Sequence, residues 1–164
     1  MPRCRKKLGE IKSVKGQRPP AYAVFRNRSP RAVDILWLDW TGQRVNYTTD
    51  GLPPGTQMLM NTYQGHPWIF RDHSSDDRLV CRVGNERRGR EIYFPTPMVD
   101  NRATPVAVNI YLPVFTLRER ALQVVRAFTK TADFEKLELP RVLISELRNR
   151  DDTIEVDDED APPD

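Results

Sequence analysis

Residues 21–112 consist of short apolar or alternating runs separated by turn residues. Residues 21–28, AYAVFRNR, alternate in polarity, and residues 33–40, VDILWLDW, are rich in branched and aromatic side chains. Further runs follow at short, fairly regular spacing: TQMLMNTY, HPWIFRD, RLVCRV, REIYF and PVAVNIYL. Turn sequences such as Leu-Pro-Pro-Gly at 52–55 lie between them. About seven short strands punctuated in this way predict a β-sandwich or a partial barrel.

The hydrophobic period changes at Thr116. Thr116 and Glu119 form the pattern of a capping box, in which each side chain hydrogen-bonds the other residue's backbone N–H. Apolar residues then recur at helical spacing: Leu117, Ala121, Val124, Val125 and Phe128. A second short helix at 133–138 and a third beginning at Pro140 are also predicted. About 30 helical residues are too few for a core of their own. They either pack on the β domain or are completed by a partner chain.

The charged residues are concentrated at the two ends. Residues 1–18 carry seven Lys/Arg and one Glu, and residues 151–164 carry eight Asp/Glu and no Lys/Arg. Blocks of like charge are typical of solvated, disordered segments. We therefore expect an α+β, mainly β chain: a basic disordered tail at 1–18, a β-sandwich domain at 19–113, a small three-helix domain at 114–150 and an acidic disordered tail at 151–164. A nucleic-acid contact or a nuclear address is the alternative for the basic arm.

The remaining chemistry argues against an enzyme. Cys4 and Cys81 are too few for a disulfide framework, and reduced thiols suit the cytoplasm and nucleus. His66 and His73 lack the paired spacing of a zinc site, and no nucleotide-binding or hydrolase motif occurs. We expect no metal, no cofactor and no catalytic residue. The N-terminus has no apolar signal-peptide core, and no stretch approaches the roughly 18 apolar residues of a membrane span.

One cluster indicates a binding pocket. Trp37, Tyr47 and Trp68 are large rings, and Thr62 and His66 lie nearby in the sequence. The rings could pack against a compact apolar ring, while Thr62 and His66 hydrogen-bond a polar group on it. The alternative is a β core with two ordinary tryptophans.

An ordered series of motifs then adds to this interpretation. The series comprises Asn27-Arg28-Ser29-Pro30-Arg31, Trp37-Leu38, Leu52-Pro53-Pro54-Gly55-Thr56, Tyr63, Gly65-His66 with Trp68, Phe70-Arg71-Asp72, Asn109-Ile110, Leu112-Pro113-Val114, Thr116-Leu117, Glu119-Arg120 and Leu122-Gln123-Val124-Val125-Arg126. In this order, over about residues 20–148, the chain resembles the von Hippel–Lindau tumour suppressor family. The family combines a β-sandwich with a small helical domain.

The resemblance implies a function. Members of this family are substrate-recognition subunits of an elongin–cullin ubiquitin ligase, and bind a hydroxylated proline in a peptide of the hypoxia-inducible factor α subunit. By position, the pocket would be Trp37, Tyr47, Thr62, His66 and Trp68. The elongin C site would be Leu117, Arg120, Ala121 and Val125, and the cullin box Leu139, Pro140, Leu143 and Leu147. Elongin B and a ring-domain subunit would complete the assembly.

The chain departs from the family at several positions. Thr62 stands where the family has Ser, Ala121 replaces the usual Cys, and Thr48 replaces Pro. Asp50-Gly51 resembles a two-residue insertion, and the family's terminal segment, which packs on the β domain, is missing or replaced. Two alternatives therefore stay open. One is an adaptor of the same fold without hydroxyproline recognition, and the other is a nucleic-acid-binding β domain.

Overall fold

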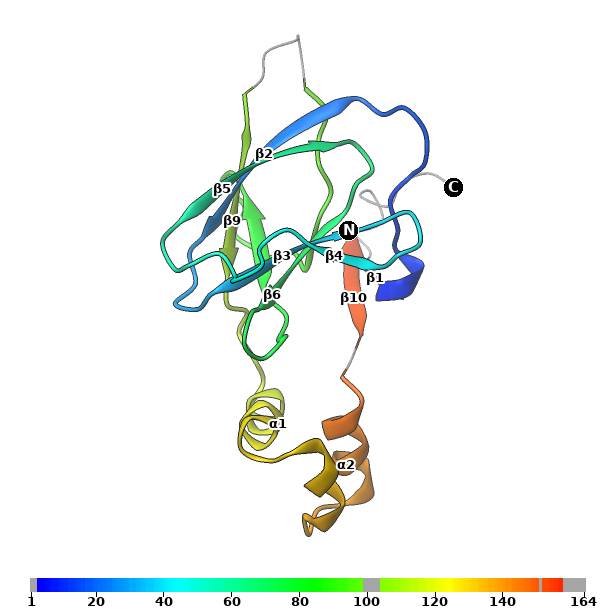
Figure 1. The fold of residues 1–164 in the computed structure, drawn as a ribbon, viewed down its shortest axis with the longest axis vertical. Helices are drawn as coiled ribbons and strands as arrows, with labels where there is room; N and C mark the ends of the chain where they lie inside the picture. Colours follow the sequence, from blue (N-terminus) through cyan, green and yellow to red (C-terminus); the bar gives the residue numbers. More distant parts are fainter. Residues whose placement is uncertain (1–2, 99–103, 151, 158–164) are drawn as a thin grey trace. The chain divides into compact units, whose positions relative to one another are not determined.

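The computed structural model describes residues 3–98, 104–150 and 152–157. The chain divides into two compact units. The β unit comprises Met1–Pro113 and Thr153–Asp164, and the helical unit comprises Val114–Asp152. The predicted class, a mainly β chain with a β domain followed by a few helices, is confirmed (Figure 1).

Two four-stranded sheets form the sandwich of the β unit. The first has the order β5-β2-β9-β7, and its strands are β2 (Pro20–Asn27), β5 (Gln57–Tyr63), β7 (Val80–Val83) and β9 (Val106–Tyr111). The second has the order β4-β3-β6-β8, and its strands are β3 (Val33–Leu38), β4 (Arg44–Asn46), β6 (Trp68–Asp72) and β8 (Ile92–Tyr93). Strands β2 and β9 pair in parallel, and the other pairs described within these two sheets are antiparallel.

Aromatic rings fill the space between the sheets. Strand β2 alternates buried and partly exposed side chains along its length, as the sequence pattern predicts for a strand with one face toward a core. Phe25, which is fully buried, lies 5.3 Å from both Trp68 and Phe70 between ring centroids. Tyr93 meets Phe25 edge-on at 6.0 Å. This core holds β3, β5 and β6 in the positions from which the pocket is built.

Parts of both predicted tails form strands that pair with each other. Residues 3–7 form β1 (Arg3–Lys7), which pairs antiparallel with β10 (Thr153–Asp157) (Figure 1). A 3₁₀ turn, η1 (Leu8–Glu10), follows β1. The prediction of disordered ends at 1–18 and 151–164 is therefore wrong for β1, η1, the buried Ile11 and Ser13, and β10. Residues 1–2, 151 and 158–164 of those segments lie outside the described residues.

The prediction failed because it weighed the charge of these segments and overlooked the alternation of apolar and polar residues in β10. Ile154 and Val156 alternate with polar residues in β10, and both are at most 2% exposed. They join a second hydrophobic cluster with Leu8 and Ile11 from the N-terminal segment and Leu36, Leu38, Ile69 and Ile92 from the second sheet. The opposite charges of β1 and β10 lie in register, with Arg5 across from Glu155. Opposite charges across a strand pair attract rather than repel.

The helical unit contains α1 (Leu117–Phe128), η2 (Thr131–Lys136) and α2 (Arg141–Arg148). The predicted capping box is present: the Glu119 N–H donates to the Thr116 hydroxyl, and the Thr116 N–H donates to the Glu119 carboxylate at 2.7 Å. The core is small, since only Phe134, Ile144 and Leu147 are buried in it, with Leu122, Val125 and Leu137 packed against them. Among the described residues, no helix is long and apolar enough to cross a membrane.

Candidate functional site

The predicted pocket residues come from both sheets. Trp37 lies on β3, Thr62 on β5 and Trp68 on β6. Tyr47 directly follows β4, and His66 lies in the turn between β5 and β6. Strands β3 and β6 pair so that Trp37 and Trp68 are directly opposite each other. Strand pairing, together with one tight turn, therefore brings together side chains that span about 30 residues of sequence.

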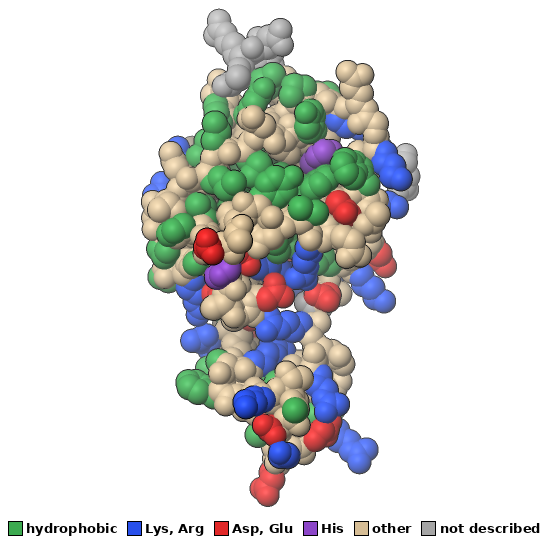
Figure 2. Space-filling view, viewed as in Figure 1, with side chains coloured by type: hydrophobic (Ala, Val, Ile, Leu, Met, Phe, Trp, Pro, Cys, Tyr) green, Lys and Arg blue, Asp and Glu red, His purple; other side chains and the backbone are tan. Residues whose placement is uncertain are grey.

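Ring contacts group these residues into two pairs, which meet where Trp37 and Trp68 lie opposite each other on paired strands; we call this group the ring cluster. The His66 imidazole stacks on the Trp37 indole, with centroids 5.3 Å apart and planes 29° apart. Tyr47 meets Trp68 edge-on at 5.0 Å. Trp37 and Trp68 are almost buried, while Tyr47 is 44% exposed. Figure 2 shows a broad patch of hydrophobic side chains over the β unit, with a histidine among them.

Two polar groups of this ring cluster retain hydrogen-bonding capacity. The Trp68 indole N–H donates to the Thr62 hydroxyl at 3.0 Å, which leaves the hydroxyl hydrogen free to donate within the described structure. Burial lowers the pKa of His66 below its ordinary value. The imidazole is therefore neutral near pH 7, so that one ring nitrogen donates and the other accepts. A ligand hydroxyl could accept from Thr62 and donate to His66.

Three neighbours of the pocket escaped the sequence reasoning. Trp40, 46% exposed, meets Trp37 edge-on at 4.9 Å, and Tyr63, 49% exposed, lies 5.4 Å from His66 between ring centroids. Ser13 is buried and accepts a hydrogen bond from the Trp37 indole N–H at 2.7 Å. The exposed rings could have been found, since Trp40 ends the aromatic run that contains Trp37. Ser13 carries no such signal, because it lies in a segment that was interpreted as a disordered tail.

The departure at Thr48 has a structural explanation. Its hydroxyl accepts from the backbone N–H of Ile35 at 3.0 Å, and the neighbouring Tyr47 N–H donates to the Ile35 carbonyl at 3.0 Å. Thr48 thus continues the contact with β3 just beyond the end of β4, beside Tyr47. Gly51 closes the following turn with φ +71° and donates its N–H to the Thr48 carbonyl. A side chain at residue 51 would be strained in that left-handed conformation.

The first helix, α1, carries an exposed apolar stripe. No residue of α1 is buried. Leu117 is 88% exposed and Phe128 is 86% exposed, and Ala121 and Val124 are exposed between them at helical spacing. Of the predicted elongin C residues, Leu117, Arg120 and Ala121 are exposed, whereas Val125 packs partly against the unit's own cluster. Val124 and Phe128 belong to the exposed stripe but were not in the predicted set.

The four predicted cullin-box residues differ in accessibility. Leu139 and Pro140 are exposed just before α2, Leu143 is half-buried, and Leu147 is only 2% exposed. Leu147 is therefore a core residue of the helical unit, because its side chain completes the cluster with Phe134 and Ile144.

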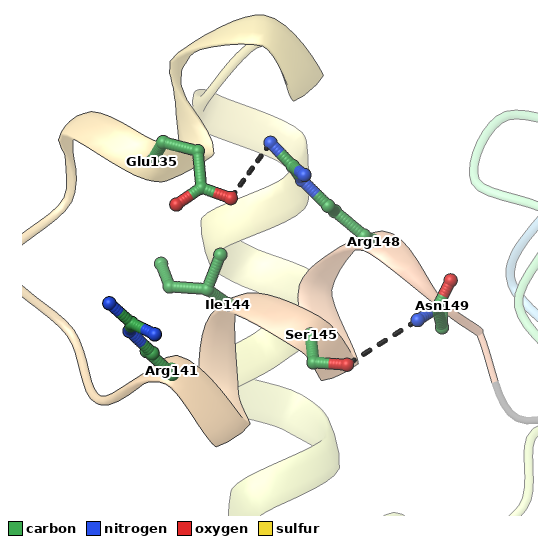
Figure 3. Close-up of a pocket in the computed structure, with 6 residues that line it drawn as sticks. All are labelled: Glu135, Arg141, Ile144, Ser145, Arg148 and Asn149. Carbon is green, nitrogen blue, oxygen red and sulfur yellow. Dashed lines mark hydrogen bonds and ion pairs between the residues drawn. The ribbon is translucent and has the colours of Figure 1, made fainter.

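The helical unit also has a hollow of about 390 Å³ beside η2 and α2, and Figure 3 shows its lining. The lining residues come from η2, α2 and the residue after α2: Glu135, Arg141, Ile144, Ser145, Arg148 and Asn149. The Arg148 guanidinium pairs with Glu135 at 2.9 Å across this hollow. None of the five predicted pocket residues of the β unit lines it.

Comparison with known protein families identifies the family of this chain. A family model described as the VHL beta domain matches residues 11–101, more than half of the chain. A second, described as the VHL box domain, matches residues 115–156. The chain belongs to the VHL family. It is also similar to Protein Vhl of Drosophila melanogaster, with 29% identity over 110 residues.

The VHL family match covers both structural units. The beta-domain match includes the strands that carry the predicted pocket, and the box match runs through the three helical elements into β10. Strand β1 lies outside both matched ranges, so its pairing with β10 comes from the structure alone. The similarity covers 63% of this chain and 59% of the Drosophila protein.

Proposed function

We propose that this protein is the substrate-recognition subunit of an elongin–cullin ubiquitin ligase, and that its β unit binds a hydroxyproline-containing degradation sequence of hypoxia-inducible factor α. The observation that carries the proposal is the ring cluster, in which the His66 imidazole stacks on Trp37 and the Thr62 hydroxyl is hydrogen-bonded to Trp68. The membership of the VHL family supports the same role. The subunit needs no catalytic residue, because a ring-domain partner would recruit the charged ubiquitin carrier.

The selectivity in this proposal follows from unpaired polar groups. A hydroxyproline ring would lie among Trp37, Tyr47 and Trp68, and its hydroxyl would pair with Thr62 and His66. An unmodified proline would fill the same apolar space but leave both polar groups desolvated and unpaired. Each unpaired group costs roughly 1–3 kcal/mol. Sites built around a ligand hydroxyl can therefore discriminate by about 10⁴-fold against the analogue that lacks it.

The exposed stripe of α1 supports the assembly half of the proposal. A monomeric protein gains nothing by leaving Leu117 and Phe128 almost fully in water, and such contiguous apolar surface is typical of a partner interface. An amphipathic helix that inserts its apolar side chains into a groove is a recurrent recognition mode. We propose elongin C as this partner, with elongin B bound to it. Leu139 and Pro140 are the accessible part of the proposed cullin contact.

One specific observation favours a second candidate, an adaptor of the same fold without hydroxyproline recognition. Thr62 is only 3% exposed, and its hydroxyl already accepts from Trp68. The methyl group of Thr62, absent from the family's usual Ser, reduces the space around this hydroxyl. The nucleic-acid alternative has less support, because the basic strand β1 pairs with the acidic strand β10.

A single titration separates the two candidates. The full chain, co-purified with elongins B and C, is titrated with a hydroxyproline-bearing degradation peptide and with its unhydroxylated twin. Binding of the hydroxylated peptide alone is the expected result. Equal or absent binding of both peptides by a stable elongin complex would leave only the adaptor role. Failure to co-purify with elongins would remove the assembly half of the proposal.

A further inference from the structure

Ser13 is a buried hydroxyl that hydrogen-bonds one of the predicted pocket rings, Trp37. It is 3% exposed and comes from the segment between η1 and β2, far in sequence from every pocket residue. Its hydroxyl accepts from the Trp37 indole N–H at 2.7 Å and donates to the Leu38 carbonyl at 2.5 Å. Both hydrogen-bonding roles of the serine side chain are therefore used at the end of β3.

The backbone around Ser13 also ties the two sides of the pocket together. The Ser13 N–H donates to the Asp39 carbonyl at 2.9 Å, just beyond β3. The Val14 N–H donates to the Gly65 carbonyl at 3.0 Å, in the turn that carries His66. Gly65 has φ +78°, and a Cβ there would lie 3.2 Å from the Val14 side chain. This segment therefore crosslinks β3 to the turn that carries His66.

We propose that Ser13 is a positioning residue of the pocket, whose hydroxyl fixes the Trp37 indole and, through the stacked rings, the His66 imidazole. The inference rests on the proposed function, since it concerns the same pocket. It makes ligand binding depend on Ser13, which is not one of the five residues proposed to contact the ligand. Two of those five, Trp37 and His66, would depend on a residue that does not touch the ligand.

The physical argument concerns orientation rather than contact. A tryptophan ring can swing about the broad terminal torsion that attaches it to its side chain. A hydrogen bond to the ring nitrogen removes that freedom, and the stacked imidazole follows the indole plane. With alanine at residue 13, the indole N–H would lack its partner and the ring would reorient to find one. We expect hydroxylated-peptide Kd to rise about tenfold, the equivalent of roughly one net hydrogen bond.

The test compares Ser13→Ala with Ser29→Ala. Ser29 is the matched control, because it is 4% exposed and its hydroxyl donates to Asn27 Oδ1 at 2.7 Å in the same β unit, away from the pocket rings. Both variants and the wild type are titrated with the two peptides as elongin complexes, and their Tm values are measured. Ser13→Thr, which retains the hydroxyl, is the rescue variant. In ¹⁵N-labelled chains, the indole N–H signals of Trp37, Trp40 and Trp68 report ring position directly.

The expected result has three parts. Both alanine variants lose stability, only Ser13→Ala loses affinity for the hydroxylated peptide, and only Ser13→Ala shifts the Trp37 indole signal. Unchanged affinity, or an unchanged Trp37 signal, in a folded Ser13→Ala protein would overturn the inference. If Ser29→Ala weakened binding equally, the effect would be general destabilisation, and the inference would also fail. If the wild-type protein bound both peptides equally, the proposed function itself would be wrong, and the inference about Ser13 would be wrong as well.

Discussion

At the scale of single residues, the buried side chain of Asn27 satisfies several backbone groups of one turn. Asn27 is fully buried, and its amide donates to the carbonyls of Arg31 and Leu52 at 2.7 and 2.8 Å. Its side-chain oxygen accepts from the Ser29 N–H at 2.9 Å. The Asn-Arg-Ser-Pro-Arg motif thus builds a turn that an unpaired buried amide would destabilise. It contributes to the family pattern through folding rather than through ligand binding.

His66 is the pocket residue whose loss separates binding from folding. His66→Ala removes one of the two proposed hydrogen bonds to the ligand hydroxyl, so hydroxylated-peptide affinity should fall at least about tenfold. Stability should change much less, because His66 is only half-buried, its imidazole has no hydrogen bond among the described residues, and alanine retains the backbone hydrogen bond to the Tyr63 carbonyl. His73→Ala is the control, since His73 pairs with Asp34 at 2.8 Å outside the ring cluster. Equal losses of binding and stability in His66→Ala would contradict the pocket role.

Asp72 should make stability depend on pH in the acid range. Burial raises its pKa, but hydrogen bonds from Ser74 and Arg31 outweigh burial and hold the pKa below its ordinary value. Its contribution to stability is therefore complete above about pH 4 and lost as pH falls through the lower folded-state value. Asp72→Asn should lower the unfolding free energy by about 2 kcal/mol near pH 7, because hydrogen bonds to a buried charge are lost.

Denaturant unfolding between pH 7 and pH 2.5 measures this effect. The difference between wild type and Asp72→Asn should narrow as the pH falls below about 4, when the wild-type carboxylate becomes protonated. Asp76→Asn is the matched control, because Asp76 is exposed and forms a surface ion pair with Arg44 at 3.3 Å. Surface pairs contribute about 0–1 kcal/mol. A constant difference between wild type and Asp72→Asn at all pH values would argue against the lowered pKa.

At the scale of elements, the pairing of β1 with β10 covers the outer hydrophobic cluster. Ile154→Ala should lower the unfolding free energy by about 2–4 kcal/mol, because it opens a cavity beside Leu38 and Ile69. Lys7→Ala, an exposed change on β1, should have little effect. Chemical denaturation of the full chain measures both. If Ile154→Ala were neutral, residues 153–157 would be the disordered tail that their charge suggested.

The exposed stripe of α1 should determine adaptor binding. Leu117→Asp places a charge at the centre of the proposed elongin C contact and should abolish co-purification with elongins B and C, while peptide binding by the β unit persists. Val142→Asp is the control, because Val142 is also exposed, at 64%, but lies on α2. Pull-down of each variant measures the effect. A Leu117→Asp chain that still formed the complex would show that the helix is not the docking element.

At the scale of the whole molecule, the two units differ in how much core they possess. The β unit has two hydrophobic clusters, whereas among its described residues the helical unit buries only Phe134, Ile144 and Leu147. A unit of this size is too small to be independently stable on its own core. Ion pairs such as Arg118 with Glu146 at 2.6 Å join α1 to α2, but exposed pairs add little.

We therefore expect the isolated chain to lose its helices before its sandwich. Amide hydrogen exchange should be fast in α1 and slow in β2 and β9, because local stability follows buried contacts. Binding of elongin C should slow exchange in α1 without changing exchange in β2, since ligands stabilise the state to which they bind. If the isolated chain, without partners, unfolded in a single sharp thermal transition that included the helices, this expectation would be contradicted.

Sequence patterns alone predicted the sandwich strands, the capping box at Thr116 and the helical stripe that begins at Leu117. These features depend on local periodicity and on side chains a few residues apart, so they are legible along the chain. The five pocket residues stood out along the chain as an aromatic cluster, and the resemblance to the family assigned their roles. These roles stay predictions, although strand pairing does bring those side chains together.

Only the tertiary structure showed that segments near the two chain ends pair with each other and which residues surround the pocket. Residues 3–7 and 153–157 meet across about 150 positions of sequence, and the charge of each segment alone argued for disorder. Ser13 supports Trp37 across 24 positions, and Leu147 belongs to a core rather than to a surface. Contacts between distant segments depend on how whole elements pack, and no local pattern encodes them. The sequence by itself determined which elements form and which family they resemble; packing alone decided which residues hold the site in place.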